Sequence, residues 1–308
     1  MPAINSTTIL QGPCKIVFGG ATFYSEGAVT VKLSEVRWMV KVQGFRTVQE
    51  RVSNRRYEIS FKPAGEWRNL AVLFPYGATP IGTQIFNNTP LTIWTREATA
   101  NKRVFSNAAI TKLSGILAHV KDTILGDVTF TCLLKNSTLP GASDAYVVRS
   151  NDTYPVETLD PSTIVSPIYS HAWGGDAPWN SFNVGDGGVV YDFPLELRDQ
   201  NVDGLGTVNM IIKDHRATAK FTPVGVTEAQ LLAAVGANTV FGSAPTTNNL
   251  IVSGAGVDIT LYAAQLRDEN LNFSTDADRI GEVMAMATQG FDDGAALPLY
   301  RIDTEEEE

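Results

Sequence analysis

The amino-acid sequence predicts a mainly β protein built from two tandem domains, each with one short helix. Its 308 residues fit two domains of about 150 residues each. Runs rich in Val and Thr, interrupted by many of the 26 glycines, are typical of strands and turns rather than of helices. One stretch of the chain also occurs twice at a fixed separation, which indicates a duplicated fold.

The repeated stretch begins with Glu-Gly-Ala-Val-Thr-Val at residues 26–31, matched by Asp-Gly-Gly-Val-Val-Tyr at residues 186–191. A Phe-x-Pro-x-Gly motif follows at Phe61 and again at Phe221. The separation between these two residues equals that between residues 26 and 186, and we call it the repeat spacing. Near the end of each copy the separation is slightly smaller, between 108–109 and 263–264 and between 125–128 and 280–283. Four matches in order favour duplication over coincidence among strands rich in Val and Gly. The residues that mark the expected core of the repeat are Phe61, Pro63, Gly65, Phe221, Pro223 and Gly225.

The repeat divides the chain into three parts. Residues 1–135 form the first expected domain, in which residues 1–13 are an extended arm. Residues 186–308 form the second, which ends in an acidic tail at 305–308. Residues 136–185 contain five prolines and too many aromatic residues for a free linker, so we expect an ordered connector or an inserted loop with its own contacts.

Alternating apolar residues place the expected strands, and a period of three to four residues places one helix after each Phe-x-Pro-x-Gly motif. In the second helix, Thr227 is the expected N-cap, and Ala229, Leu232 and Ala233 are expected to face inward. The expected helices are 66–74 and 227–235. The expected strands are 14–18, 29–33, 36–42, 57–61, 91–94, 103–110, 115–121 and 127–134, then 189–193, 195–198, 208–213, 217–221, 250–252, 258–262, 271–273 and 281–287.

A long hairpin is expected between residues 36 and 61. Its central part, about residues 43–54, is polar and basic and has few apolar anchors. The tip should therefore project beyond the core of the domain. The basic residues that we single out in it are Arg46, Arg51, Arg55 and Arg56.

The two copies differ in charge. Residues 1–135 carry 16 Lys and Arg against 8 Asp and Glu, whereas residues 181–308 carry 7 against 20. The acidic tail accounts for only four of these carboxylates, so the whole second copy has become acidic. Because opposite charges attract across a contact, the first copy should prefer the second copy as its neighbour.

Residue types that would indicate catalysis or a cofactor do not come together in the sequence. Cys14 and Cys132 have no CxxC partner and are expected to be small buried hydrophobes rather than a disulfide. His119, His171 and His215 lie in different segments without metal-ligand spacing. No nucleotide-binding or nucleophile motif and no apolar membrane span is visible. We therefore expect no enzyme, no cofactor and no membrane insertion.

These features together resemble the major tail tube protein of long-tailed bacteriophages. The resemblance lies in the layout: an N-terminal arm, the long hairpin, one flanking helix, and a last strand approached through Gly-Asp-Val-Thr at residues 126–129. It implies two tandem tail-tube-like domains, each a β-sandwich or small barrel, and covers both copies but not residues 136–185. The family's sequence signals are weak, and it offers no catalytic residues to carry over.

The resemblance implies a virion protein that is assembled in the host cytoplasm as stacked rings. A duplicated chain is similar to the rarer form in which three subunits make a pseudo-hexameric ring. The implied partners are other copies of the chain, the tape measure, terminator and distal tail proteins, and DNA that passes through the lumen without specific binding. An acidic lumen repels phosphate and lets DNA slide. The basic hairpin residues would then meet acidic groups of an adjacent ring.

Two other functions remain open from the sequence. A tail hub or distal tail protein also uses duplicated tube-like domains, but it caps a tube instead of repeating along it. A carbohydrate-binding or hydrolytic β-sandwich protein would expose an aromatic platform beside carboxylates, for which Trp173 and Trp179 are the candidates. Packing of residues 136–185 is the simpler interpretation of these two tryptophans.

Overall fold

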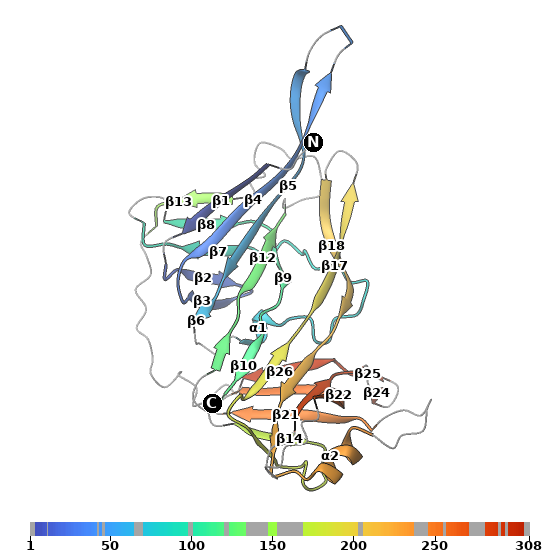
Figure 1. The fold of residues 1–308 in the computed structure, drawn as a ribbon. Helices are drawn as coiled ribbons and strands as arrows, with labels where there is room; N and C mark the ends of the chain where they lie inside the picture. The colour runs from blue at the N-terminus through green and yellow to red at the C-terminus, as the bar shows by residue number, and fades with distance from the viewer. Residues whose placement is uncertain are drawn as a thin grey trace.

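The chain is mainly β, as predicted, in a computed structural model whose described residues also include two short helices (Figure 1). The structure describes residues 4–10, 12–41, 43–44, 47–64, 70–97, 101–119, 123–133, 147–152, 169–202, 206–236, 246–254, 257–270, 281–288, 291–292 and 295–304. None of the helices within these ranges is long and apolar enough to cross a membrane.

The first unit consists of two sheets that face each other. One has the strand order β1-β4-β5-β12-β9 and the other β13-β8-β7-β2-β3-β6. Phe18 and Tyr57 reach across the space between the sheets to Phe130 and Phe105, at ring distances of 4.9 and 5.7 Å. The first sheet comprises β1 Ile4–Leu10, β4 Val29–Lys41, β5 Thr47–Phe61, β9 Ala108–Lys112 and β12 Val128–Cys132; the second comprises β2 Lys15–Phe18, β3 Ala21–Ser25, β6 Pro63–Ala64, β7 Leu91–Trp94, β8 Lys102–Phe105 and β13 Val147–Ser150.

The second unit uses the same strand partners. β14 pairs with β21 as β2 pairs with β7, β15 pairs with β20 as β3 pairs with β6, and β26 pairs with β22 as β13 pairs with β8. Its elements are β14 Ser170–Trp173, β15 Asn183–Val184, β16 Val189–Asp192, β17 Leu195–Val202, β18 Gly206–His215, β19 Thr218–Phe221, β20 Pro223–Val224, α2 Glu228–Ala234, β21 Asn248–Gly254, β22 Val257–Asn270, β23 Glu282–Met286, β24 Phe291–Asp292, β25 Ala295–Ala296 and β26 Tyr300–Thr304.

The hairpins of the two units agree residue by residue. Val36 pairs with Asn54 in the first hairpin, and Glu196 pairs with Asp214 in the second, so both partners are displaced by the repeat spacing. The register of the first hairpin shifts directly after Val36 and again before Lys41, and the second hairpin shifts at the two equivalent positions. β-Bulges are conserved features of a fold rather than accidents. Their repetition therefore defines which positions of the two units are equivalent.

The core markers of the repeat occupy equivalent places in the units. Phe61 on β5 pairs with Val128, and Phe221 on β19 pairs with Val283; both aromatic residues are buried. Pro63 and Pro223 start the two short strands β6 and β20. Gly225 has a φ of 80°, a left-handed turn conformation that glycine adopts without strain, and Gly65 lies outside the described residues.

Several expected elements differ from the structure. The arm is a strand, β1, paired with β4. The sequence predicted no strand at β3, β6, β11 (Thr123–Leu125), β13, β14, β15, β20, β24, β25 or β26. The expected strand 103–110 is two strands joined by a turn, and the two expected strands 29–33 and 36–42 are one. In the second unit, by contrast, the strand equivalent to β4 is divided into β16 and β17 near Pro194, which has no N–H to donate. The expected strand 271–273 and the acidic tail lie outside the described residues.

The inward face of the second helix was predicted wrongly. Thr227 is the N-cap and forms a capping box with Gln230, as a Thr at this position favours. Leu231 and Ala234 are buried, whereas Ala229 and Ala233 are exposed and Leu232 is half-buried. The run of Ala and Leu is apolar on nearly every side, so its periodicity does not select a face. In the first unit, α1 spans Leu70–Leu73, and residues 65–69 lie outside the described part.

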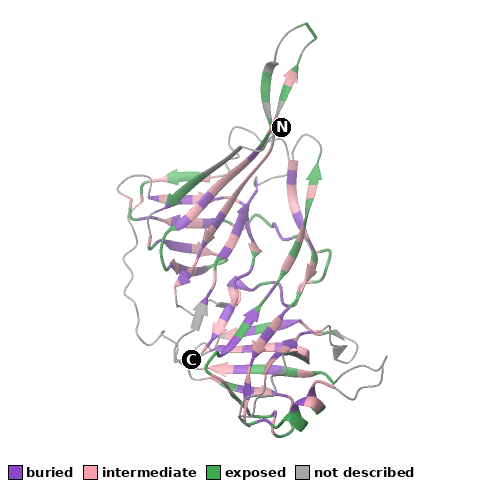
Figure 2. Cartoon of the chain, in the orientation of Figure 1, coloured by how far each residue is buried: buried purple, intermediate pink, exposed green. Residues whose placement is uncertain are grey.

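The described parts of residues 136–185 are strands of the two units rather than a separate element. β13 completes a sheet of the first unit, and β14 and β15 start the second. The second unit therefore begins before residue 186. Its sheet also takes in β10 Ile116–Ala118 and β11 Thr123–Leu125 from the first half of the chain, because β10 pairs with β16. This pairing and a continuous buried core join the units into one body (Figure 2).

Substitution of Gly188 tests the pairing of β10 with β16. Gly188 has a φ of 65°, and a Cβ there would lie 2.3 Å from the carbonyl oxygen of Ala118. We expect Gly188→Ala to lower the free energy of unfolding by about 2 kcal/mol or more, because it adds backbone strain to a clash with backbone. Gly187→Ala is the matched control, since no atom lies within 4 Å of its Cβ position. Equal urea midpoints for the two variants would contradict this account.

Candidate assembly surface

The hairpin of β4 and β5 extends beyond both sheets of the first unit, as predicted (Figure 1). Its projecting part is largely exposed or half-buried, in contrast to the buried strands below it (Figure 2). Three apolar side chains of this part are exposed, Val36 by 39%, Met39 by 42% and Val52 by 44%. Their exposure on a projecting strand pair makes this part of the hairpin a candidate interaction surface.

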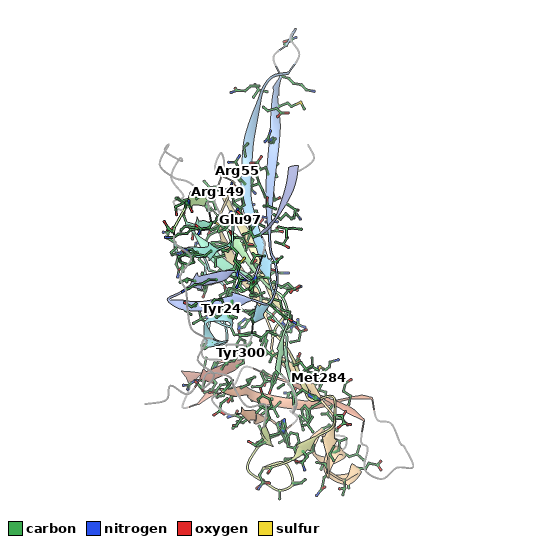
Figure 3. All side chains as sticks on the ribbon, turned by 90° about the vertical axis from the view of Figure 1, so that its left-hand side faces the viewer. Tyr24, Arg55, Glu97, Arg149, Met284 and Tyr300 are labelled. Carbon is green, nitrogen blue, oxygen red and sulfur yellow. The ribbon has the colours of Figure 1, made fainter. Side chains whose placement is uncertain are left out.

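A buried carboxylate fixes the base of this hairpin. Glu35 is only 2% exposed, although it lies on the strand that leaves the sheet. One carboxylate oxygen accepts a hydrogen bond from Arg37 at 2.9 Å, and the other contacts the guanidinium of Arg55 on β5. Arg37 also reaches Glu50 across the hairpin, at 3.4 Å. Because Glu35 joins both strands where they leave the sheet, it orients the projecting part. Figure 3 shows Arg55 at the base of the projecting hairpin.

The two arginines keep Glu35 ionised. Burial by itself raises the pKa of a carboxyl group, but the hydrogen bond from Arg37 and the charge of Arg55 outweigh it, so the pKa of Glu35 lies below its usual value. A carboxylate with a lowered pKa stabilises the fold at neutral pH. That contribution is lost as the pH falls through the pKa of the folded protein.

The hairpin of β17 and β18 lies against the first unit. Asn54 Nδ2 donates to the hydroxyl oxygen of Thr207 at 3.0 Å, and Arg56 Nη1 lies 3.5 Å from a carboxylate oxygen of Asp199. Arg56 also contacts Glu58 at 3.3 Å. The tip of the second hairpin is thus attached to the side of the first by polar contacts that are partly open to solvent.

Backbone hydrogen bonds from the first unit cover the edge of β18. Gly82 N donates to Ile212 O at 2.8 Å, Ile212 N donates to Thr83 O at 3.1 Å, and Ile85 N donates to Met210 O at 3.0 Å. The side chain of Asn209 extends this contact, because it donates to Phe86 O and accepts from Phe86 N at 3.1 Å each. Residues 82–86 therefore behave as an added strand, and Ile212 is completely buried.

Aromatic side chains fill the joint between the units below this edge. The rings of Phe74 and Phe193 lie 5.0 Å apart, and those of Phe193 and Tyr300 lie 4.6 Å apart. Leu299 N donates to Gly77 O at 2.8 Å, and a Cβ on Gly77 would lie 2.1 Å from Tyr300 O. Figure 3 shows Tyr300 where the upper and lower parts of the body meet. The joint is therefore closely packed.

The structure brings together two of the four basic residues that the sequence singled out. Arg55 and Arg56 are paired within the chain, with Glu35 and with Glu58 and Asp199. They hold the hairpin in place, which the sequence did not predict. Arg46 and the side chain of Arg51 lie outside the described residues. Sequence reasoning also missed Glu35, Asp199 and residues 82–86. The repeat spacing is a sequence signal that could have been used here, because it places Asp199 at the same hairpin position as Met39.

Trp173 and Trp179 do not form an exposed platform. They are only 4% and 7% exposed, and their rings lie edge to face at 5.8 Å. Trp173 Nε1 also donates to Ala264 O at 3.0 Å, which satisfies its only polar group. Both side chains pack in the second unit, so these two tryptophans do not form the exposed aromatic platform that a carbohydrate site would require.

Among the residues that the structure describes, no three His, Cys, Asp or Glu side chains come together to hold a metal ion. Both cysteines are buried thiols, as predicted. His119 lies 2.6 Å from Asp186 O, while burial lowers the pKa of His171 and His215. A comparison with known families finds no matching family model, and no curated protein matches the sequence.

Replacement of Glu35 tests its role at the base of the hairpin. We expect Glu35→Gln to lower the free energy of unfolding by about 1–3 kcal/mol at pH 7, because two arginines then face a neutral group. Glu50→Gln is the control: its carboxylate is exposed and contacts one of the same arginines, so the change should stay below about 0.5 kcal/mol. The measurement is urea unfolding at several pH values.

The pH dependence gives this experiment a second readout. Protonation removes the charge that the Gln variant also lacks. The difference between the wild type and Glu35→Gln should therefore shrink as the pH falls below the usual carboxyl range, about 4. A difference that stays constant down to pH 3 would show that the loss comes from packing and not from charge.

Proposed function

We propose that the protein is a structural virion protein that polymerises as stacked rings into the tail tube of a long-tailed bacteriophage. Its two units are then tandem tail-tube-like β domains, and three chains make each pseudo-hexameric ring. The tube conducts DNA from the capsid to the host and binds the tape measure, terminator and distal tail proteins. The observation that carries the proposal is the joint between the two units.

The joint is head to tail. The two units have equivalent hairpins, but the first unit presents residues 82–86 and the second presents the edge of β18. Two equivalent units thus meet through different surfaces. A contact of this kind leaves one surface of each type unused, and its repetition gives a closed ring or a filament. The opposite charges of residues 1–135 and 181–308 favour the same alternation between chains.

The second feature that supports the proposal is the projecting hairpin. A tube needs contacts between rings as well as within them. The part of the β4–β5 hairpin beyond Glu35 extends from the body and carries exposed apolar residues, which suits a contact between copies. Arg46 and Arg51 remain the basic residues proposed to face acidic groups of an adjacent ring.

Electron microscopy of the purified protein tests the proposal. We expect long polymers or uniform stacks of rings, and an image reconstruction with three chains in each ring. A tail hub or distal tail protein would give single rings or caps that do not extend. A sixfold ring of six whole chains would refute the threefold arrangement but leave the tube intact, whereas a protein that stays monomeric under all conditions would refute the tube.

Shortening the hairpin tests its part in polymerisation. Deletion of residues 44–53 should leave a folded, soluble protein, because this part contributes no buried core residue among those described. We expect circular dichroism like that of the wild type and no tubes in micrographs. Normal polymers from the deletion variant would remove the hairpin from the assembly.

Salt should act on assembly more than on finished tubes. The screening length falls from about 8 Å at 0.15 M salt to about 3 Å at 1 M, so attraction between the oppositely charged halves weakens. Exposed ion pairs are worth only about 0–1 kcal/mol each, and strand edges and apolar faces hold the finished tube. We therefore expect 1 M salt to slow the rise in light scattering while preformed tubes persist. Rapid dissolution of finished tubes would contradict this.

A further inference from the structure

Among the residues that the structure describes, the edge of β5 from Glu50 to Val52 is open, although the equivalent edge of β18 is covered. Val52 is 44% exposed, whereas Ile212, at the same hairpin position one repeat spacing later, is completely buried. Residues 82–85 bond to the backbone of Met210 and Ile212, whereas the described residues provide no such bonds to Glu50 and Val52 on the side away from β4. Among the described residues, β5 is paired on this side only with β12, from Tyr57 to Phe61.

The two edges also present the same backbone groups. Met210 O, Ile212 N and Ile212 O point away from β17 and bond to residues 82–85. Because the register and both bulges are identical, Glu50 O, Val52 N and Val52 O point away from β4. An unpaired edge with an exposed apolar side chain is a template for another strand.

We propose that this edge of β5 binds the second unit of another copy of the chain, in the way that the edge of β18 binds the first unit. The inference rests on the proposed ring and names the surface that closes it. It also gives the hairpin a lateral role: its β5 edge holds the neighbour within a ring, whereas the tip is left for the adjacent ring.

The rest of the first unit limits the contact to this hairpin. In the second unit, β10 covers the outer edge of β16 from Val189 to Tyr191. At the equivalent place in the first unit, β1 already covers β4, from Val29 to Glu35. Strand β4 is therefore closed by the chain's own residues below Glu35. The contact is therefore left to the β5 edge of the hairpin, at Glu50 to Val52.

The repeat spacing also identifies the facing surface of the neighbour. Within the chain, Arg56 lies against Asp199. Between chains, their equivalents are Arg216 of the second unit and Met39 of the hairpin. Arg216 is exposed and forms an ion pair with Asp214 at 2.9 Å, so this surface presents a polar ion pair to the hairpin.

Thiol crosslinking of the wild-type background tests the surface, because Cys14 and Cys132 are buried and do not react. The variant Met39→Cys with Arg216→Cys, treated with a short bifunctional maleimide, should give covalent dimers and trimers of the chain. The matched control, Arg56→Cys with Asp199→Cys, should crosslink within one chain and run as a monomer. Each single variant should remain a monomer.

The outcomes separate this inference from the proposed function. Rings or tubes in micrographs without crosslinked chains would overturn the β5 edge as the contact and leave the tube proposal standing. Dimers from Met39→Cys alone would overturn the head-to-tail arrangement, because they require two hairpins to meet. A protein that neither assembles nor crosslinks would overturn both.

A second variant tests the edge without crosslinks. Val52→Asp places a carboxylate where an apolar side chain would be covered, and we expect ring formation to weaken at least tenfold by sedimentation. Val148→Asp on β13 is the control, because Val148 is 52% exposed and lies at the edge of the other sheet. Equal assembly of the two variants and the wild type, with unchanged circular dichroism, would overturn the proposal.

Discussion

The peptide groups at the edge of a β-strand bond either to water or to another segment, and the way in which the chain covers one such edge fixes the arrangement of its two units. Residues 82–86 bond to the edge of β18 and bury Ile212, and this contact holds the second hairpin along the side of the first unit. The pairing of β10 with β16 and the aromatic joint at Phe193 and Tyr300 hold the units from the other side. Together these contacts allow a single arrangement of the two units.

Because the register is repeated, the joint inside the chain indicates which surfaces another molecule could contact. Two hairpins with the same bulges present the same edges, so an edge that is covered in one and open in the other is a candidate for a contact with another molecule. The difference between Ile212 and Val52 is such a case. In the proposed ring, this other molecule is a second copy of the chain.

The side chains around the hairpins show how two equivalent frameworks have diverged. The first hairpin keeps Glu35 buried between Arg37 and Arg55, which fixes the direction in which the strands leave the sheet. In the second unit Pro194 interrupts the strands near the equivalent position, and the first unit supports the hairpin instead. The first hairpin is therefore held by ion pairs between its own strands, and the second hairpin is held by contacts with the first unit. This allows the first hairpin to project.

The sequence by itself determined the mainly β class, the repeat, the Thr227 cap and the projecting hairpin, because each depends on local patterns of alternation, spacing and polarity. It also placed Phe61 and Phe221 in equivalent strands. Only the tertiary structure decided that Arg55 and Arg56 are paired within the chain, that Trp173 and Trp179 are buried, and that Leu231 rather than Ala229 faces the core. These outcomes depend on contacts between residues far apart in the chain, such as Arg56 with Asp199, and no local pattern records which distant groups meet.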